Sequence, residues 1–265
     1  MSASIKSMEA NLWDHLAFLA KGCKDATVRD TPDLLLVDSG LKSDVFNKIG
    51  RCMLNPRFAA DRIQAAVDHF RKKTEPAPFT WLTGPLSGQG ALDATLRELG
   101  LTPKQQSWGM LLQLDTAQLP PSPTTDLEIK RATSKAGVKD FATVVAELWT
   151  PPDENVVKFY ESAADAVLAT GAQMKLYVGY KGGKPVATTE AFYAHGVVGL
   201  SNIITTSAEQ GKGYGIVLMI AALKDAKKFN QRMAAVQADE KSKALYQRVG
   251  FKPAGQFAEY RWAAN

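Results

Sequence analysis

Residues 201–226 read SNIITTSAEQGKGYGIVLMIAALKDA, and this stretch decides the fold. An apolar strand predicted over residues 197–205 runs into Gln210-GKGYG, and a helix predicted over residues 215–229 follows at once. Glycines let the backbone turn with its N–H groups pointing inward, and the positive end of the helix dipole lies at the same place. The loop therefore predicts a diphosphate site, with Lys212 as a further positive charge.

Two other phosphate-binding loops fit the glycine spacing poorly. A Walker A loop needs Ser or Thr after Gly-Lys, whereas Gly213 follows Lys212. A dinucleotide-binding loop needs the pattern GxGxxG, whereas the glycines here stand at 211, 213 and 215, with Val217 beyond. The remaining alternative is a plain glycine-rich turn before a helix, and the pattern around the loop argues against it.

The elements around this loop alternate between strand and helix. Hydrophobic periodicity and turn residues predict the order strand, two helices, three strands, helix, strand, helix, strand. In residue numbers these are 126–132, 138–148, 156–170, 174–180, 186–193, 197–205, 215–229, 233–238, 241–249 and 251–262. Gly250 is expected to end the last helix, and Lys181-GGK to form a hairpin turn.

A proline-rich segment, Gln118-LPPSPTT, divides the chain, because three prolines in four residues exclude a helix or a central strand. We predict domains at 1–118 and 127–265, with a linker at 119–126. The first part ends in a similar order to the second: helix 59–72, strand 79–84, helix 91–99 and strand 108–115. The helix ends Leu96-RELGL and Tyr246-QRVGF are also alike, which indicates a diverged internal duplication.

Composition narrows the class of protein. The chain has 265 residues, 45% hydrophobic and 22% charged, which is the balance of a soluble globular protein. The net charge of +5 suits an anionic ligand, and the absence of a block of consecutive Lys or Arg disfavours nucleic acid. Cys23 and Cys52 have no CxxC spacing, and the three histidines are scattered, so no metal site is expected. Neither a secretory signal nor a membrane span is recognisable, so we expect a cytoplasmic protein with no membrane partner.

Several motifs together resemble those of the GCN5-related N-acetyltransferase (GNAT) superfamily. Gln210, Gly213 and Gly215 give the pattern Gln-x-x-Gly-x-Gly, and Thr205-TSAEQGKGYG is similar to the family's strand-then-loop segment. Ala244-LYQRVGF is similar to its later helix, which carries a tyrosine and closes on Gly-Phe. With Gln237-AD and Pro78-FTWLTGP, the chain is similar to two-part bacterial members whose N-terminal half is degenerate.

The resemblance implies an α/β (α+β) fold: a GNAT-type mixed sheet flanked by helices, preceded by a smaller α/β domain. It implies that two adjacent parallel strands, 197–205 and 233–238, splay apart around the pantetheine arm of acetyl-CoA. Ile203 then polarises the acetyl carbonyl through its backbone N–H, and Ile204 and Thr205 contact the cofactor. By the same resemblance, the pyrophosphate binds to the loop of Gln210, Gly211, Lys212, Gly213, Tyr214 and Gly215. Acetyl-CoA is the co-substrate, and no metal is needed.

The resemblance also suggests catalytic groups. Tyr246 matches the tyrosine that protonates the leaving thiolate; the alternative is a core aromatic packed under Phe251. The glutamate that some relatives use as base falls near Gly199, so Glu190 on the preceding strand is the candidate base, against the alternative of a solvated carboxylate. A water chain through Ser201 or Asn202 is a further route. Asp239 stands where many relatives have Asn, so its pantetheine contact is in doubt.

The expected function is transfer of an acetyl group from acetyl-CoA to a primary amine of a small molecule or peptide. The alternatives are a non-catalytic acyl-CoA sensor and an acyltransferase for longer acyl groups. Three aromatic residues are candidates for the pocket of the acceptor amine: Trp149, Phe159 and Tyr160. The alternative is that they belong to the hydrophobic core. The first part is expected to bind no acyl-CoA, because Gly84-PLSGQG has the wrong spacing. A monomer and a homodimer are both compatible with the sequence.

Overall fold

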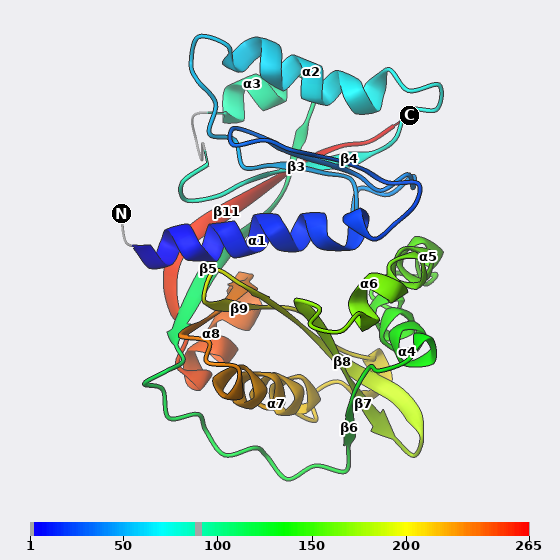
Figure 1. Cartoon of the computed structure of the whole chain (residues 1–265), viewed down its shortest axis with the longest axis vertical. Coiled ribbons are helices and arrows are strands. Elements are labelled where there is room, and N and C mark those ends of the chain that lie inside the picture. The colour runs from blue at the N-terminus through cyan, green and yellow to red at the C-terminus, as the bar shows by residue number, and fades with distance from the viewer. Residues whose placement is uncertain (1–2, 88–91, 265) are drawn as a thin grey trace. The chain divides into compact units, whose positions relative to one another are not determined.

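The computed structural model describes residues 3–87 and 92–264, and Figure 1 shows its ribbon. The chain forms two compact units. One contains the residues up to Gly109 together with those from Ala254, and the other is Met110–Pro253.

The second unit is built on a mixed sheet. Its strands β7 (Met174–Lys181), β8 (Lys184–Ala194) and β9 (Val197–Thr205) form an antiparallel meander, with β6 (Glu128–Arg131) antiparallel to β7 at one edge. On the other side of β9, β10 (Met233–Ala238) runs parallel to it. The strand order is β6-β7-β8-β9-β10-β5, where β5 (Thr102–Gln113) contributes its last residues.

Helices pack on both faces of this sheet because β7 alternates its side chains. The Tyr177 hydroxyl reaches Asp225 of α7 (Tyr214–Lys228), whereas the Tyr180 hydroxyl reaches Asp140 of α4 (Lys135–Ala146) on the other face. The remaining helices of this unit are α5 (Glu154–Ser162), α6 (Ala164–Leu168) and α8 (Glu240–Val249). The buried side chains of α4 and α7 include Phe141, Val144, Leu218, Ile220 and Leu223.

The predicted order of elements is confirmed, and the two strands expected to flank the cofactor have the predicted bounds, 197–205 and 233–238. One helix differs. The prediction of a continuous helix over residues 156–170 is wrong, because Ala163 leaves the helical conformation and separates α5 from α6. The proline-rich segment has no regular secondary structure.

The first unit begins with α1 (Ala3–Lys21), followed by an antiparallel meander of β1 (Thr27–Asp30), β2 (Leu35–Asp38) and β3 (Lys48–Gly50). After α2 (Ala59–Arg71), β4 (Phe79–Thr83) runs parallel to β3. Then come α3 (Asp93–Glu98), β5, and β11 (Lys252–Trp262). The strand order is β1-β2-β3-β4-β11-β5, and the helix 91–99 predicted here begins outside the described residues.

The same succession of elements occurs twice along the sequence, once from β1 to β5 and again from β7 to β11. A three-stranded antiparallel meander leads into a helix, a strand parallel to the third meander strand, a second helix and a final strand. In the first unit the parallel pair is β3 with β4, and in the second it is β9 with β10. This repetition is what the predicted internal duplication requires.

The last strand groups with the first unit. Ala258 pairs with Thr83, and Trp262 with Phe79, in an antiparallel ladder between β11 and β4. A division of the sequence at 118 and 126 follows chain order and assigns this strand to the second part. The pairing that groups it with the first unit joins residues 175 or more positions apart, so no local pattern marks it.

Candidate active site

The pairing between β9 and β10, the two parallel strands of the second unit, stops before either strand ends. Their paired residues run from Met233 with Val197 to Val236 with Leu200. Beyond this pair β9 continues to Thr205 and β10 to Ala238. Residues 201–205 of β9 therefore extend beyond its ladder with β10, and an extended ligand with amide groups suits such an edge.

The loop after β9 leads into α7 through two residues in the left-handed conformation. Gly211 has φ 80° and Gly213, the N-cap of α7, has φ 79°, a region that favours glycine. Gly213 supplies no side-chain cap. Because the first N–H groups of a helix have no acceptor within it, those of the first turn stay available for an anion beside the positive end of the helix dipole.

The start of α7 is fixed in place. Tyr214 is buried, and its hydroxyl donates to Asp126 Oδ1 at 2.5 Å. Gly215 lies against the end of β9, because a Cβ atom built there would be 3.2 Å from Ile203 Cγ2 and 3.9 Å from Thr205 Oγ1. The helix N-terminus is therefore adjacent to the end of β9, which lies beyond the ladder with β10 but still pairs with β8. Ile204, between the two, is buried.

The charges around the loop are already paired. Lys212, expected beside the diphosphate, has its ammonium 2.6 Å from Glu209. Glu209 also accepts from Lys181 at 3.0 Å, and hydrogen bonds from Lys212 and Lys181 lower the pKa of its carboxyl. Gln210 is exposed. An arriving diphosphate therefore competes with Glu209 for the two lysines.

Tyr246 combines features of both sequence interpretations. Its ring is buried and meets Phe251 edge-on, with 6.2 Å between ring centroids. Burial, together with the nearby charge of Asp239, raises the pKa of Tyr246 to about 12. The hydroxyl is therefore protonated at neutral pH, as a proton donor must be. Asp239 itself is the N-cap of α8, accepting from the backbone N–H of Ser242 at 2.8 Å.

Glu190 lies in a buried polar cluster. The alternative of a solvated strand carboxylate is wrong, because Glu190 is 0% exposed. Its carboxylate accepts from the Tyr160 hydroxyl and, at 2.9 Å, from Ser201 Oγ. Asn202 Nδ2 donates to the Tyr160 hydroxyl at 2.9 Å and lies 3.4 Å from Glu190 Oε2. Burial and the charge of Glu190 raise the pKa of Tyr160 well above its usual value, so Tyr160 remains a donor.

The three aromatic residues considered for the acceptor pocket differ in their exposure to solvent. Phe159 and Tyr160 are buried, which confirms the alternative that they belong to the core. Trp149 is 36% exposed, on the segment between α4 and α5, next to Leu148 at 58%. The bond between Tyr160 and Glu190 joins residues thirty positions apart on α5 and β8, so neither local pattern contained a signal for it.

One family model matches a part of the chain that lies within the second unit. The model of the Acetyltransferase (GNAT) family matches residues 141–251. The chain carries a GNAT domain. Membership of this family implies acyltransferase chemistry with an acyl-CoA as co-substrate. Among curated proteins, none matches the chain significantly.

Solved structures extend the likeness beyond the GNAT domain. A GCN5-related N-acetyltransferase from Kribbella flavida has a TM-score of 0.72 at 13% identity, covering 98% of this chain and 96% of that one. One from Sphaerobacter thermophilus has a TM-score of 0.56 at 17% identity, covering 87% and 80%. A tandem GNAT protein from the clavulanic acid biosynthesis pathway has a TM-score of 0.56 at 13% identity, covering 100% and 97%. At these identities the likeness shows the fold, which is that of two GNAT-like units.

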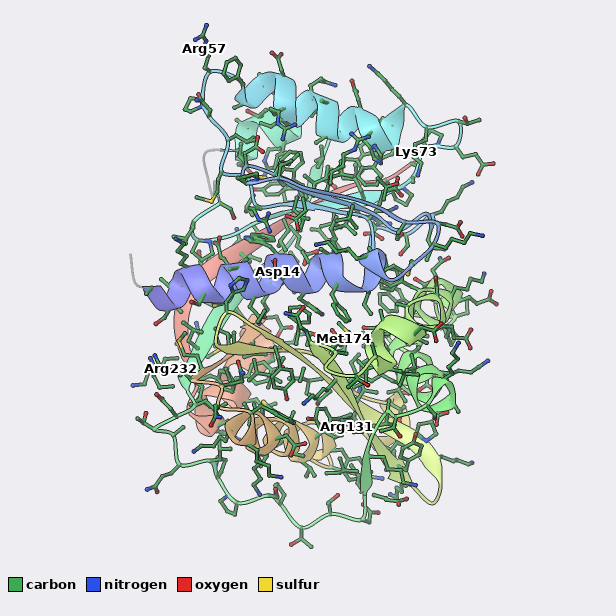
Figure 2. The ribbon with its side chains drawn as sticks, in the orientation of Figure 1. Asp14, Arg57, Lys73, Arg131, Met174 and Arg232 are labelled. Atoms are coloured by element: carbon green, nitrogen blue, oxygen red, sulfur yellow. The ribbon has the colours of Figure 1, made fainter. Side chains whose placement is uncertain are left out.

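The first unit has no counterpart of the glycine loop in the GNAT domain. In the repeated topology, the loop equivalent to Gln210-GKGYG is the one between β3 and α2, Arg51-CMLNPRF, which contains no glycine. Arg51 is bonded to Asp30, and Arg57 points outward from the loop (Figure 2). The segment Gly84-PLSGQG, whose glycine spacing differs from that of the loop, instead follows β4. Its last three residues lie outside the described ones.

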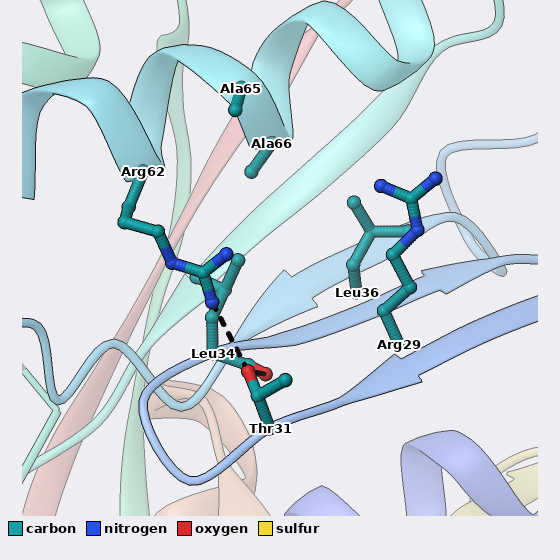
Figure 3. A pocket seen from close by; sticks show the side chains of 7 residues that line it. All are labelled: Arg29, Thr31, Leu34, Leu36, Arg62, Ala65 and Ala66. Carbon is teal, nitrogen blue, oxygen red and sulfur yellow. Dashed lines mark hydrogen bonds between the residues drawn. The ribbon is translucent and has the colours of Figure 1, made fainter.

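A pocket in the first unit lies between α2 and the β1–β2 hairpin (Figure 3). The Arg62 guanidinium there is held by Asp33 through bonds of 3.0 and 2.9 Å and also reaches Thr31. The lining residues are Arg29, Thr31, Leu34, Leu36, Arg62, Ala65 and Ala66. None of the predicted site residues belongs to it.

The described residues show neither a cluster of metal ligands nor a membrane-spanning helix. Within residues 3–87 and 92–264, no group of three or more His, Cys, Asp or Glu side chains is arranged to hold a metal ion. Over the same residues, no helix has the length and apolar character needed to cross a membrane.

Proposed function

We propose that the GNAT domain is an N-acetyltransferase that moves the acetyl group of acetyl-CoA to a primary amine of a small molecule or peptide. The observation that carries the proposal is the adjacency of two binding features. Residues 201–205 of β9 have no partner in β10, and they end against Gly215 at the uncapped N-terminus of α7. A ligand with an amide-containing arm and a diphosphate matches this pair of features.

Binding follows from the geometry of the loop and the strand. The N–H groups at the start of α7, with the loop Gln210, Gly211, Lys212, Gly213, Tyr214 and Gly215, would hold the pyrophosphate. The edge formed by Ile203, Ile204 and Thr205 would bond the pantetheine amides. The N–H of Ile203 would then donate to the thioester carbonyl, where negative charge develops during attack.

The reaction proposed is a direct displacement at the thioester. The amine nitrogen forms a bond to the acetyl carbon, the carbon–sulfur bond breaks, and the sulfur leaves with the electron pair. Tyr246 would give its proton to this sulfur. A thiol has a pKa of about 8.5, so protonating the thiolate assists the step only moderately near neutral pH. The new amide nitrogen then loses its second proton to solvent, and the Tyr246 phenolate takes a proton from solvent, so that the amide, the free thiol and the starting form of Tyr246 result.

The attacking amine must first lose a proton, since a lysine-type amine has a pKa of about 10.4. Glu190 is the proposed acceptor of that proton. Because Glu190 is fully buried, the proton would pass through the Ser201 hydroxyl, which donates to Glu190 and is itself partly exposed. The hydroxyl takes the proton from the amine as it releases its own to the carboxylate.

The burial of Glu190 also favours a second candidate function, a non-catalytic acyl-CoA-binding module. If Ser201 does not relay the proton, the cleft lacks this carboxylate as a base. Release of free CoA thiol from acetyl-CoA in the presence of a panel of small amines and peptides separates the two functions. Turnover that falls strongly in Tyr246→Phe supports the enzyme, whereas CoA binding without turnover across the panel supports the module. Longer acyl-CoAs in the same assay test whether the acyl group is acetyl.

A further inference from the structure

Two neighbouring residues of β9 contact the same buried carboxylate. Ser201 donates to Glu190 Oε1 and Asn202 approaches Glu190 Oε2. In a regular strand, consecutive side chains point to opposite faces of the sheet. The strand is therefore interrupted between these two residues.

The interruption is a β-bulge. Pairing between β8 and β9 shifts there: Glu190 pairs with Ser201 but Thr188 pairs with Ile204, so Asn202 and Ile203 together face Thr189. Asn202 has φ 46°, in the left-handed region that Asn adopts more readily than most residues.

The bulge decides which way the end of β9 faces. Ile203 and Thr205 lie beside Gly215 of α7, on the opposite face from the cluster around Glu190. If Ser201, Asn202 and Ile203 formed a regular strand without the bulge, Ile203 would share the face of Ser201, because side chains two positions apart lie on one face. A one-residue change of register would thus turn Ile203 and Thr205 away from the N-terminus of α7.

Bonds from two elements, α5 and β8, hold the bulge. Asn202 Nδ2 is anchored on the Tyr160 hydroxyl of α5 at 2.9 Å, and the Asn202 carbonyl accepts from Thr188 Oγ1 of β8 at 2.9 Å. Tyr160 in turn donates to Glu190. The buried carboxylate and phenol therefore fix the side chain of Asn202, the left-handed residue at the bulge, and Thr188 fixes its backbone.

We infer that Tyr160 and Glu190 act as a clamp on the β9 bulge, which sets the direction of Ile203 and Thr205 toward acyl-CoA. Both are positioning residues in this role, and Glu190 has it in addition to any part in proton transfer. The inference rests on the proposed function for its consequence, but the clamp itself is a property of the free protein.

The test variant is Tyr160→Phe, which keeps the buried ring and removes only the hydroxyl. Its matched control is Tyr180→Phe, since Tyr180 also donates to a carboxylate, Asp140 at 2.7 Å, but belongs to β7. Hydrogen exchange of the free protein is expected to quicken at residues 201–205 in Tyr160→Phe and not in Tyr180→Phe. The Kd for CoA is expected to rise about tenfold in Tyr160→Phe, the loss of one hydrogen bond to a charged group, and less than twofold in the control.

Two further variants separate conformation from anchoring. Asn202→Ala loses the amide anchor and disfavours the left-handed conformation, so it is expected to weaken CoA binding at least as much as Tyr160→Phe. Asn202→Gly loses the anchor but adopts this conformation freely, so part of the affinity is expected to return.

The outcomes distinguish the clamp from the proposed function. If Tyr160→Phe melts like the wild type, exchanges residues 201–205 at the wild-type rate and binds CoA equally well, the clamp is refuted and the function stands. If the wild type binds no CoA, the proposed function fails, while the exchange rates of the free protein still decide the clamp. Should Tyr160→Phe prove unfolded, wild-type-like exchange and binding in Asn202→Ala would refute the clamp instead.

Discussion

Leu200 and Val236 are the last residues that pair across the parallel strands β9 and β10. Up to this pair the two strands share a ladder, and beyond it each presents an edge without the other. The pair marks the point where a ligand would replace a strand.

This arrangement predicts a local response to CoA. On adding saturating CoA, amide exchange is expected to slow at residues 201–205 and 213–215, because the ligand supplies acceptors for N–H groups there. Exchange in β7 is expected to stay unchanged. Mass spectrometry of the exchanged peptides measures both. Equal slowing over the whole GNAT domain would contradict a local site and indicate general stabilisation instead.

Replacing Tyr246 by Phe is expected to lower kcat about 10- to 100-fold while changing the KM for acetyl-CoA little. The hydroxyl acts on the leaving sulfur, and general acids contribute about 10²-fold or more where the leaving group needs a proton. A thiolate needs it less, which sets the lower limit. Steady-state thiol release measures both parameters, with Tyr180→Phe as control. A change confined to KM would instead indicate that Tyr246 only binds the cofactor.

The titration of Tyr246 sets the alkaline limit of activity. Because its pKa is raised to about 12, the donor form persists as pH rises through 10, where an exposed tyrosine ionises. The kcat profile is therefore expected to show no loss attributable to Tyr246 between pH 8 and 10. A descending limb near pH 10 that disappears in Tyr246→Phe would contradict the raised pKa.

Gly213 and Gly183 form a matched pair for testing the loop. Both have φ 79°, and a Cβ atom added at either meets nothing within 4 Å. Substitution by Ala is therefore expected to cost each about 1 kcal/mol of unfolding free energy, through the same backbone strain. Only Gly213→Ala is expected to weaken CoA binding, because Gly183 lies in the β7–β8 hairpin. Denaturant unfolding and calorimetric titration give the two quantities, and an equal loss of affinity in both variants would remove the loop from the site.

Glu209→Gln is expected to strengthen CoA binding about two- to fivefold at low salt. The substitution removes the carboxylate shared by Lys212 and Lys181. Lys212 then becomes available to the diphosphate, whereas Lys181 keeps Asp126, 3.3 Å away, as a partner. Since these groups are near the surface, the gain is expected to shrink as salt rises to 0.5 M. Titration at two salt concentrations tests this, with Glu154→Gln, an exposed position on α5, as control. A weaker affinity in Glu209→Gln would mean that Glu209 orders the loop more than it competes.

The lowered pKa of Asp38 makes the stability of the first unit depend on pH in the acid range. Burial alone would raise the pKa of this carboxyl, but hydrogen bonds from His69 and Lys73, each at 2.8 Å, hold it well below its usual range. A depressed folded pKa gives stability that is present above the unfolded value of about 3.9 and is lost as pH falls toward the folded one. Asp38→Asn is therefore expected to destabilise by about 1–3 kcal/mol at pH 7 and by less at pH 3. Urea unfolding at both pH values, with exposed Asp25→Asn as control, checks this; a difference independent of pH would be inconsistent with it.

Sequence patterns were most informative where chemistry is local. The end of β9, the glycine loop and the first turns of α7 are contiguous, so periodicity and turn residues sufficed to place them. The bounds of β9 and β10 were predicted to the residue for the same reason. Lys212 shows the limit of this approach, since its carboxylate partner Glu209 was visible in the sequence, but its side-chain pairing was not.

Contacts across long stretches of chain were out of reach. The cluster of Tyr160, Glu190 and Asn202 depends on a bulge, and a bulge changes side-chain direction without changing the alternating pattern enough to be read. Similarly, the break at Ala163 occurs within a run of alanines that favour helix, so tertiary packing and not propensity ends α5 there. The partner of β11 lies at the other end of the sequence.

The pairing of β11 with β4 has a consequence for how the protein is made. The ribosome synthesises the chain from its N-terminus, so β1 to β4 of the first unit emerge long before β11. Ala258 and Trp262 of β11 complete the ladder with β4. Until β11 has been synthesised, one edge of β4 lacks this neighbour, and exposed edges of this kind can pair with wrong strands. A nascent chain stalled just after the GNAT loop should therefore engage chaperones through its first hundred residues, although those residues were the first to be translated.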